Sequence, residues 1–271
     1  MSFLSKSDPF RAELRLALDA AREAAALISA RTGAEAVREK GRADLVTEVD
    51  EAVERLVTAR IRAVFRADAV VGEELSSRAV TSGRRWIVDP VDGTTNFVHG
   101  HPFVCVSIAF ADDAGPAAGV IHAPFLREVF HATRGGGAFL NDAPIRASAV
   151  DEPGRALLAT GFPFKKGKGN LDAYMALVAD VVRATHDVRR DGSAALDLAY
   201  VAAGRLEGFF EIGLSPWDVA AGLLLVTEAG GRVSGWPGDV EEPLVTGRVL
   251  ASNGGIHEWL AEVTGRWVGE L

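Results

Sequence analysis

Cysteine is nearly absent from this chain of 271 residues, which has one, Cys105. A single cysteine excludes an intrachain disulfide framework and is compatible with a reducing compartment. Cys105 lies in the apolar run 103–110, which is typical of a strand, so we expect a buried and unreactive thiol. No Cys-x5-Arg loop surrounds it, and His99 and His101 lack a zinc-like spacing to cysteine or acids.

Long apolar stretches are also missing, and none approaches the length of a transmembrane helix. The segment from Asp8 to Gly33 predicts an amphipathic helix that carries charges, and it lacks the uncharged core of a signal peptide. We therefore expect a cytoplasmic protein with no membrane partner. The net charge of −8, from 37 acidic and 29 basic residues, makes a nucleic-acid-binding surface spread over the chain unexpected.

One segment, Trp86 to Gly100, is dense in chemical groups. The apolar start, Trp86 to Val88, predicts a buried strand that ends in Asp89-Pro90-Val91-Asp92-Gly93-Thr94. Proline fixes its own φ and glycine permits a tight turn, so the two aspartates are held at the end of a strand. Carboxylate and carbonyl oxygens suit hard cations, and freed backbone N–H groups suit phosphate.

Asp-Pro and Asp-Gly are also ordinary turn formers, so the two aspartates alone favour a structural role. Other acids sit in comparable places: Gly72-Glu73-Glu74 follows the short apolar run Ala69 to Val71. In Ser215-Pro216-Trp217-Asp218 the serine resembles an N-cap, and the aspartate would be the third helical residue. For Asp218 a capping role is about as expected as a functional one. The segment Asp44 to Asp50 opens a predicted amphipathic helix, in whose first turn Asp50 would suit the helix dipole.

Together and in this order, these segments resemble the inositol monophosphatase family of magnesium-dependent, lithium-sensitive sugar phosphatases. The resemblance runs from Asp44 to about Gly231, and its most specific string is Asp-Pro-Val-Asp-Gly-Thr-Thr-Asn-Phe at 89–97. Leu75 is a small departure, because many relatives carry serine after Gly-Glu-Glu; it touches no matched ligand.

The resemblance implies a role for individual residues. Glu73, Asp89 and the carbonyl group of Val91 match one metal site, and Asp89, Asp92 and Asp218 match a second. Thr94 with Asp50 matches the pair that orients the attacking water, and together with Glu73 they are the expected catalytic residues. The expected contacts to substrate are the N–H groups of Gly93 and Thr94, and Asp92, Gly192, Ser193, Ala194, Glu211 and Asp218.

A cluster of acids agrees with metal chemistry. Two like charges about 4 Å apart cost roughly 4 kcal/mol at an effective dielectric near 20, so converging acids require cations or protonation. Because the matched ligands are all oxygens, Mg²⁺ is expected rather than Zn²⁺, with two or three ions implied per site. A pair of divalent ions can stabilise both the attacking and the leaving oxygen of an in-line displacement.

The order of predicted strands and helices indicates a mixed α+β chain of layered sheets. The resemblance implies a layered αβαβα sandwich of two tightly packed halves with the active site between them. We place the boundary in the polar stretch 143–154, with residues 1–147 as the metal-binding half and 148–271 completing the metal and substrate site.

The expected activity is hydrolysis of inositol-1-phosphate or a similar small polyol phosphate. Glu211 precedes Asp218 by seven residues, as in inositol phosphatases, and Thr95 stands where relatives acting on phosphoadenosine or histidinol phosphate often carry lysine. Fructose-1,6-bisphosphate, nucleotides and histidinol phosphate remain alternative substrates. The resemblance also implies a homodimer, with room for an interface near the run Phe103 to Phe110, and it admits a role as a partner of the transcription machinery.

Overall fold

The computed structural model describes residues 8–31, 37–41, 44–75, 82–163 and 169–271. The helices are α1 (Arg11–Ala30), α2 (Glu48–Val64), α3 (Thr94–Val98), α4 (Leu171–Ala184), α5 (Ala194–Ala202), α6 (Pro216–Glu228), α7 (Pro243–Thr246) and α8 (His257–Gly265), with a 3-10 turn at Pro153–Arg155. The predicted first helix is confirmed as α1, while Gly33, its expected end, lies outside the described residues.

A seven-stranded sheet forms the first half of the molecule, in the spatial order β3-β4-β5-β6-β7-β8-β9. Its strands are β3 (Ala69–Gly72), β4 (Arg85–Asp92), β5 (Cys105–Asp112), β6 (Gly115–Ala123), β7 (Glu128–Thr133), β8 (Gly137–Leu140) and β9 (Ala143–Pro144). Only β3 and β4 pair in parallel, and the others form an antiparallel meander. Residues 134–136 make the turn between β7 and β8.

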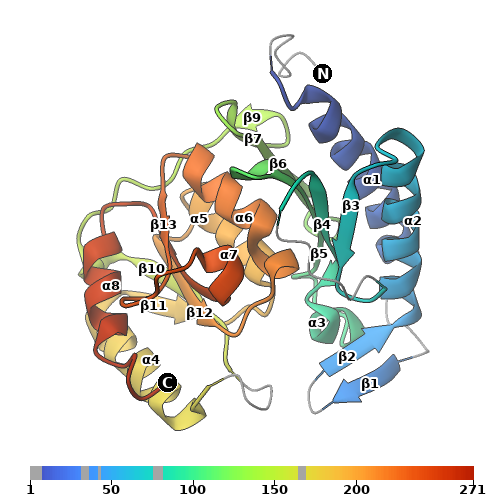
Figure 1. Cartoon of the computed structure of the whole chain (residues 1–271). Helices are drawn as coiled ribbons and strands as arrows, with labels where there is room; N and C mark the ends of the chain where they lie inside the picture. Colours follow the sequence, from blue (N-terminus) through green and yellow to red (C-terminus); the bar gives the residue numbers. More distant parts are fainter. Residues whose placement is uncertain (1–7, 32–36, 42–43, 76–81, 164–168) are drawn as a thin grey trace.

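Helices α1 and α2 cover one face of this sheet (Figure 1). Because side chains alternate along a strand, Trp86 and Val88 of β4 point to these helices, together with Ile108 of β5. They pack with buried residues such as Ala24 of α1 and Val57 of α2. Ile87 points to the opposite face, and the same alternation places Asp89 on that side.

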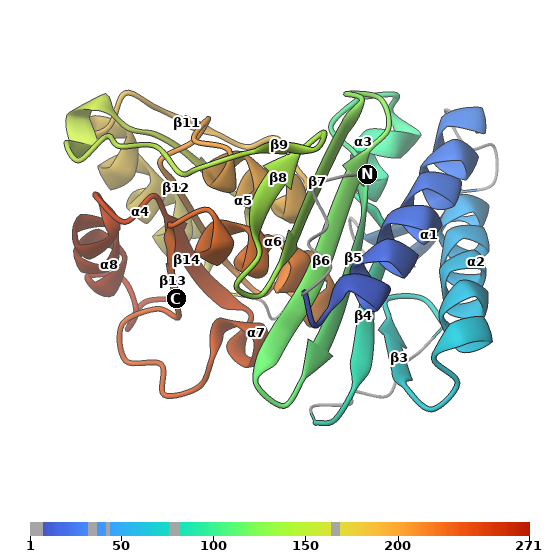
Figure 2. The same cartoon turned by 90° about the horizontal axis from the view of Figure 1, so that it is seen from above.

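Helices α5 and α6 form the middle layer against that opposite face (Figure 2). Ile87 and Ala109 of the first sheet share one buried cluster with Leu198 of α5 and Val219 of α6. The same cluster includes Phe209 of β12 in the second sheet. The two helices are thus buried between both sheets, and their apolar residues join the two halves into one core.

The second sheet has the order β11-β10-β12-β14-β13. Its strands are β10 (Leu157–Thr160), β11 (Asp187–Arg189), β12 (Gly208–Ile212), β13 (Arg232–Ser234) and β14 (Arg248–Ser252). Leu158, Phe210 and Leu250 face the outer helices, where they pack with Leu177 of α4 and Leu260 of α8. The predicted αβαβα layering is confirmed: α1 and α2, seven strands, α5 and α6, five strands, α4 and α8.

Two local predictions differ from the structure. Asp44–Thr47 is strand β2, paired with β1 (Val37–Gly41), so α2 begins only at Glu48, after the N-cap Thr47. Strand β4 does not end at Val88 but continues to Asp92. A register shift against β5 between Asp89 and Asp92 accommodates Pro90, which has no N–H group to donate to a neighbouring strand.

The run Phe103 to Phe110 is interior. Residues 105–110 belong to β5, between β4 and β6, and every residue of the run is buried within the single chain. The run itself therefore offers no surface for the expected dimer. Among the described residues, no helix is both long and apolar enough to cross a membrane.

Candidate active site

Asp89 occupies the centre of the candidate site. It is 1% exposed, and its Oδ1 accepts a hydrogen bond from the N–H of Val91 at 3.0 Å. Burial raises the pKa of Asp89 well above its usual value, and the negative charges of Glu73, Asp92, Asp218 and Asp50 raise it further. Acids from four segments of the chain thus lie close enough to Asp89 to repel its charge.

Asp92 and Asp218 are both bound to helix N-termini. Oδ2 of Asp92 accepts hydrogen bonds from the hydroxyl of Ser193 at 2.7 Å and the N–H of Ala195 at 2.8 Å. Burial and the charge of Asp218 raise the pKa of Asp92 to about 7, although these hydrogen bonds oppose the shift. Oδ2 of Asp218 accepts the N–H of Ser215 at 2.7 Å, so the expected capping box is present.

Thr94 and Asp50 lie together, as the resemblance implies. The Thr94 hydroxyl is 3.2 Å from Oδ1 of Asp50 and 3.0 Å from the carbonyl oxygen of Val91, and it can donate to one of them at a time. Asp50 is fully buried, and its Oδ2 accepts hydrogen bonds from the N–H and hydroxyl of Thr47. Burial raises the pKa of Asp50, and the bonds from Thr47 oppose that rise.

The donor chemistry of this cluster fits a divalent cation. Its side chains offer only oxygen, their charges have one sign, and burial withholds water from Asp89. The ligand set is not closed, because within the described part of the chain no three His, Cys, Asp or Glu side chains are placed together to hold a metal ion. Asp92 and Asp218 bind the N-termini of α5 and α6 through Oδ2, and a carboxylate that accepts hydrogen bonds at one oxygen can still coordinate a cation with the other.

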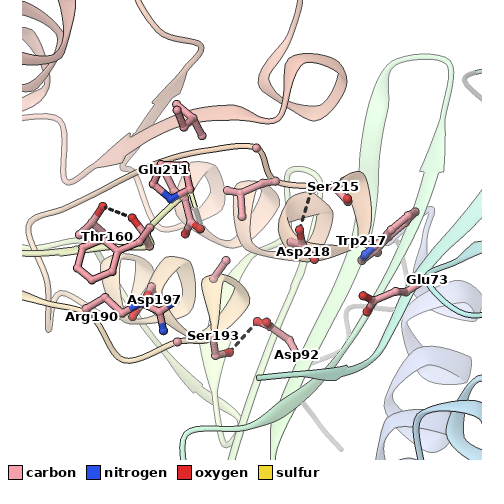
Figure 3. Close-up of a pocket in the computed structure, with 18 residues that line it drawn as sticks. Glu73, Asp92, Thr160, Arg190, Ser193, Asp197, Glu211, Ser215, Trp217 and Asp218 are labelled. Atoms are coloured by element: carbon pink, nitrogen blue, oxygen red, sulfur yellow. Dashed lines mark hydrogen bonds between the residues drawn. The ribbon is translucent and has the colours of Figure 1, made fainter. Parts of the chain in front are cut away.

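A cavity of about 450 Å³ opens beside the acids and lies between the two sheets (Figure 3). Glu73, Asp92 and Asp218 line one end of it. Arg190 and Glu211 line the other end, in the second half of the chain. All these predicted site residues therefore meet in one cavity, and Arg190 joins them as a residue that the sequence reasoning did not single out.

The segment 191–193 is joined to the segment 92–96 by two contacts. Ser193 is the N-cap of α5 and also donates to Asp92. Nδ2 of Asn96 lies 2.8 Å from the carbonyl oxygens of both Asp191 and Phe103, which ties α3 to the chain just before Gly192. The Gly192-Ser193-Ala194 segment predicted to contact substrate is thus fixed against the Asp89-Asp92 motif.

A left-handed backbone conformation makes glycine necessary at position 93. Gly93 has φ +93° and precedes α3, and an added Cβ would lie 2.8 Å from the carbonyl oxygen of Phe103. This glycine therefore permits the chain to turn directly from Asp92 to Thr94, as the sequence predicts.

A model of the inositol monophosphatase family matches residues 11–266. The chain belongs to the inositol monophosphatase family. It is 44% identical over 247 residues to a Pseudomonas aeruginosa protein named Nus factor SuhB, and the alignment covers 89% of this chain and 91% of that protein. It is 42% identical over 228 residues to the inositol-1-monophosphatase of Synechocystis sp., with coverages of 83% and 79%. The solved structure of an inositol monophosphatase from Anabaena (Nostoc) sp. matches this structure with a TM-score of 0.84 at 37% sequence identity. The match covers 95% of this chain and 97% of the Anabaena chain.

Beyond the family motifs, Glu54 supports the site in a way that sequence reasoning missed. It is fully buried on α2, and its carboxylate accepts the N–H groups of Glu74 at 2.7 Å and Leu75 at 3.0 Å. An added Cβ at Gly72 would overlap this carboxylate. Glu54 therefore fixes the turn that carries Glu73. The signal was available, since Glu54 follows Asp50 by one helical turn, toward the core.

Asp197 was also missed, although it lines the cavity. It lies on α5, where the surrounding sequence is apolar and gives no periodic sign of a buried acid. Cys105, by contrast, matches its prediction: it is buried 4.0 Å from Asp92, and burial raises the pKa of its thiol well above the usual value, so the unreactive form is favoured.

Proposed function

We propose that the chain is a divalent-metal-dependent phosphomonoesterase that hydrolyses inositol-1-phosphate, or a similar small polyol phosphate, to the free alcohol and inorganic phosphate. The observation that carries the proposal is the convergence of Asp50, Glu73, Asp92 and Asp218 on the buried Asp89. Acids crowded in this way need a cation or protonation, and phosphate ester hydrolysis is a reaction for which such cations are used.

Mg²⁺ is the proposed cofactor, with two or three ions at each site. Glu73, Asp89 and the Val91 carbonyl group would hold one ion, and Asp89, Asp92 and Asp218 a second. When bound, the ions lower the pKa of water and neutralise charge that develops on the phosphoryl group. The oxygen-only donors and the general metal dependence of the family support this assignment.

The chain's own residues have distinct tasks in this proposal. Because the Thr94 hydroxyl donates to Asp50 or to the Val91 carbonyl, its oxygen can accept a hydrogen bond from the attacking water and so orient it. The raised pKa of Asp50 makes this carboxylate a better proton acceptor at the same place. Glu73 orients the same water, while the N–H groups of Gly93 and Thr94 bind phosphate oxygens.

The second half of the chain selects the alcohol. Glu211 lines the cavity away from Glu73, and we propose that it accepts a hydrogen bond from a hydroxyl of the substrate. The N–H groups of 192–194 would face the same molecule, and Asp92 and Asp218 would contact it from the end of the cavity near Glu73. Thr95 is exposed and neutral where a lysine would favour nucleotide or histidinol phosphates.

A phosphate-release screen tests this function. The substrates are inositol-1-phosphate, fructose-1,6-bisphosphate, adenosine 3′,5′-bisphosphate, histidinol phosphate and an aryl phosphate, each with Mg²⁺ and with EDTA. We expect the highest kcat/KM on inositol-1-phosphate. A preference of more than tenfold for a nucleotide or a bisphosphate would overturn the inositol assignment but leave the phosphatase assignment intact.

A partner role in transcription is a second candidate, because relatives 43–44% identical over about nine-tenths of the chain are named Nus factor SuhB. The test is affinity capture from lysate with the Asp92→Asn protein, which separates binding from turnover. Recovery of subunits of the transcription machinery by both this variant and the wild type supports the role, and their absence from both contradicts it.

Assembly and lithium sensitivity are proposed together with the activity. We propose a homodimer, which light scattering at micromolar concentration would show by twice the 28.7 kDa chain mass. Inhibition by Li⁺ at concentrations where Na⁺ has no effect would support an Mg²⁺ site that admits a small cation.

The proposed division into halves 1–147 and 148–271 is supported by the two separate sheets. The last strand of the first sheet ends at Pro144, and the first strand of the second sheet begins at Leu157.

A further inference from the structure

Asp197 is a buried acid with one carboxylate oxygen that makes no hydrogen bond within the described residues. It is 1% exposed, and its Oδ1 has no hydrogen-bond partner in the part of the chain that the structure describes. It is also one of the residues that line the cavity. A buried polar atom without a partner destabilises the folded state. Its position at a cavity suggests that a ligand supplies the missing hydrogen bond.

Glu207 shows what a structural acid of this region does. It too is buried, at 7% exposed, but its carboxylate accepts the N–H of Leu157 at 2.7 Å and so joins the end of β10 to the strand beside it. Asp197 lies on α5, beyond the N-cap Ser193, and has no comparable bond at Oδ1. A bond within the fold therefore explains Glu207 but not Oδ1 of Asp197.

The neighbours of Asp197 favour its neutral form. Burial raises the pKa of Asp197 well above the usual value, the charges of Asp191, Glu211 and Asp92 raise it further, and the charge of Arg190 opposes them. A protonated carboxyl group offers one O–H donor and one carbonyl acceptor. An alcohol hydroxyl group has the same two capacities, whereas an ammonium group can only donate.

Position distinguishes Asp197 from the acids at the other end of the cavity. Figure 3 shows Asp197 beside Arg190 and on the side of Glu211, while Glu73, Trp217 and Asp218 lie at the opposite end. A molecule whose phosphate lies near Glu73 and Asp218 would therefore extend its alcohol portion toward Asp197.

We propose that Asp197 is a specificity-determining residue, whose carboxyl group binds a hydroxyl group of the polyol portion of the substrate. The inference rests on the proposed phosphatase function and deepens it, because it assigns a second acid besides Glu211 to recognition of the alcohol. Since little of Asp197 is exposed, only a small part of its carboxyl group would contact the substrate, where the residue lines the cavity. A substrate without a hydroxyl at this place leaves Oδ1 unpaired and is bound less well.

The test compares Asp197→Ala with Asp197→Asn. Alanine removes the group at a helical position without cost to helix propensity, whereas asparagine keeps a donor and an acceptor. The readout is the ratio of kcat/KM on inositol-1-phosphate to kcat/KM on an aryl phosphate that has no hydroxyl groups. We expect Asp197→Ala to lower the ratio at least tenfold, mainly through KM for inositol-1-phosphate, and Asp197→Asn to lower it less than threefold.

Glu207→Ala is the matched control, because it removes a buried acid that does not line the cavity and that accepts the N–H of Leu157. We expect a lower unfolding temperature in this variant with an unchanged ratio. Asp197→Ala should unfold at or above the wild-type temperature, since it removes an unpaired buried group. A lower unfolding temperature with an unchanged ratio in Asp197→Ala would show a structural role and overturn the proposal, as would an equal loss on both substrates.

Calorimetric binding of inositol-1-phosphate separates this inference from the proposed function. If the wild type releases no phosphate from any substrate, the phosphatase assignment fails; at least tenfold weaker binding by Asp197→Ala would still support recognition by Asp197. Equal binding by both proteins, or no binding by either, overturns it. A loss confined to an amino-alcohol phosphate would show an ammonium contact and contradict the hydroxyl assignment.

Discussion

The two ends of the cavity differ in charge. At one end Glu73, Asp92 and Asp218 gather near the buried Asp89, and no basic side chain among the described lining residues accompanies them. At the other end Asp197 and Glu211 share the space with Arg190, the only basic residue in the described lining. Cations or protonation would relieve the repulsion at the first end, which agrees with the proposed metal site, whereas the second end is closer to neutral and agrees with the proposed contacts to hydroxyl groups.

The largest effect is expected from Asp92→Asn at the acidic end. Losing one carboxylate ligand should reduce kcat by about 10³-fold or more, because several kcal/mol of charge stabilisation disappear. Asparagine can still accept the bonds from Ser193 and Ala195, and like-charge repulsion falls, so the metal-free variant should unfold no earlier than the wild type. Steady-state kinetics and thermal unfolding check both expectations, and kcat within tenfold of wild type would refute the two-metal assignment.

Thr94→Val tests the orientation of the attacking water. Valine keeps the shape of threonine but has no hydroxyl to link Asp50 with a water molecule, so kcat should fall about 10²-fold with little change in KM. Thr95→Val is the matched control, because the neighbouring threonine is exposed and valine keeps a neutral side chain at that position. Equal kinetics of the two variants would remove Thr94 from the mechanism.

The positions of the acids could be predicted from the sequence where the signal was local. Asp89, Asp92 and Glu73 each follow a short apolar run, and the Ser215-Pro216 pair marks the helix start that places Asp218. The partners of Asp92 could not be read in this way, because its bonds to Ser193 and Ala195 join positions about a hundred residues apart. Asp197 gave no signal, since burial of one acid on an apolar helix depends on both sheets that enclose α5.

Glu211→Gln probes the more neutral end and should act on selectivity. The ratio of kcat/KM on inositol-1-phosphate to that on an aryl phosphate should fall about tenfold, as expected when a charged acceptor of a hydroxyl proton is lost. Phosphate release from both substrates gives the ratio. An equal fall on both substrates would place Glu211 in the chemistry rather than in the choice of alcohol, and so would erase the difference between the two ends.

A smaller effect is expected in the pH dependence of stability. The folded pKa of Asp92 is about 7, above the usual 3.8, so folding binds a proton between these values and the metal-free protein loses stability as pH rises from about 4 to about 7. In EDTA the unfolding temperature should fall by at least about 2–4 °C over this range. Mg²⁺, or the Asp92→Asn substitution, should reduce that fall, and identical pH profiles in all three conditions would contradict the charge crowding at the acidic end.

The most direct test of the metal assignment is phosphate release from inositol-1-phosphate by the wild-type protein, first in EDTA and then after Mg²⁺ is restored. The charge crowding around Asp89 predicts that release stops in EDTA and returns with Mg²⁺. Release at the same rate in EDTA as in Mg²⁺ would contradict the claim that these acids act by holding metal ions.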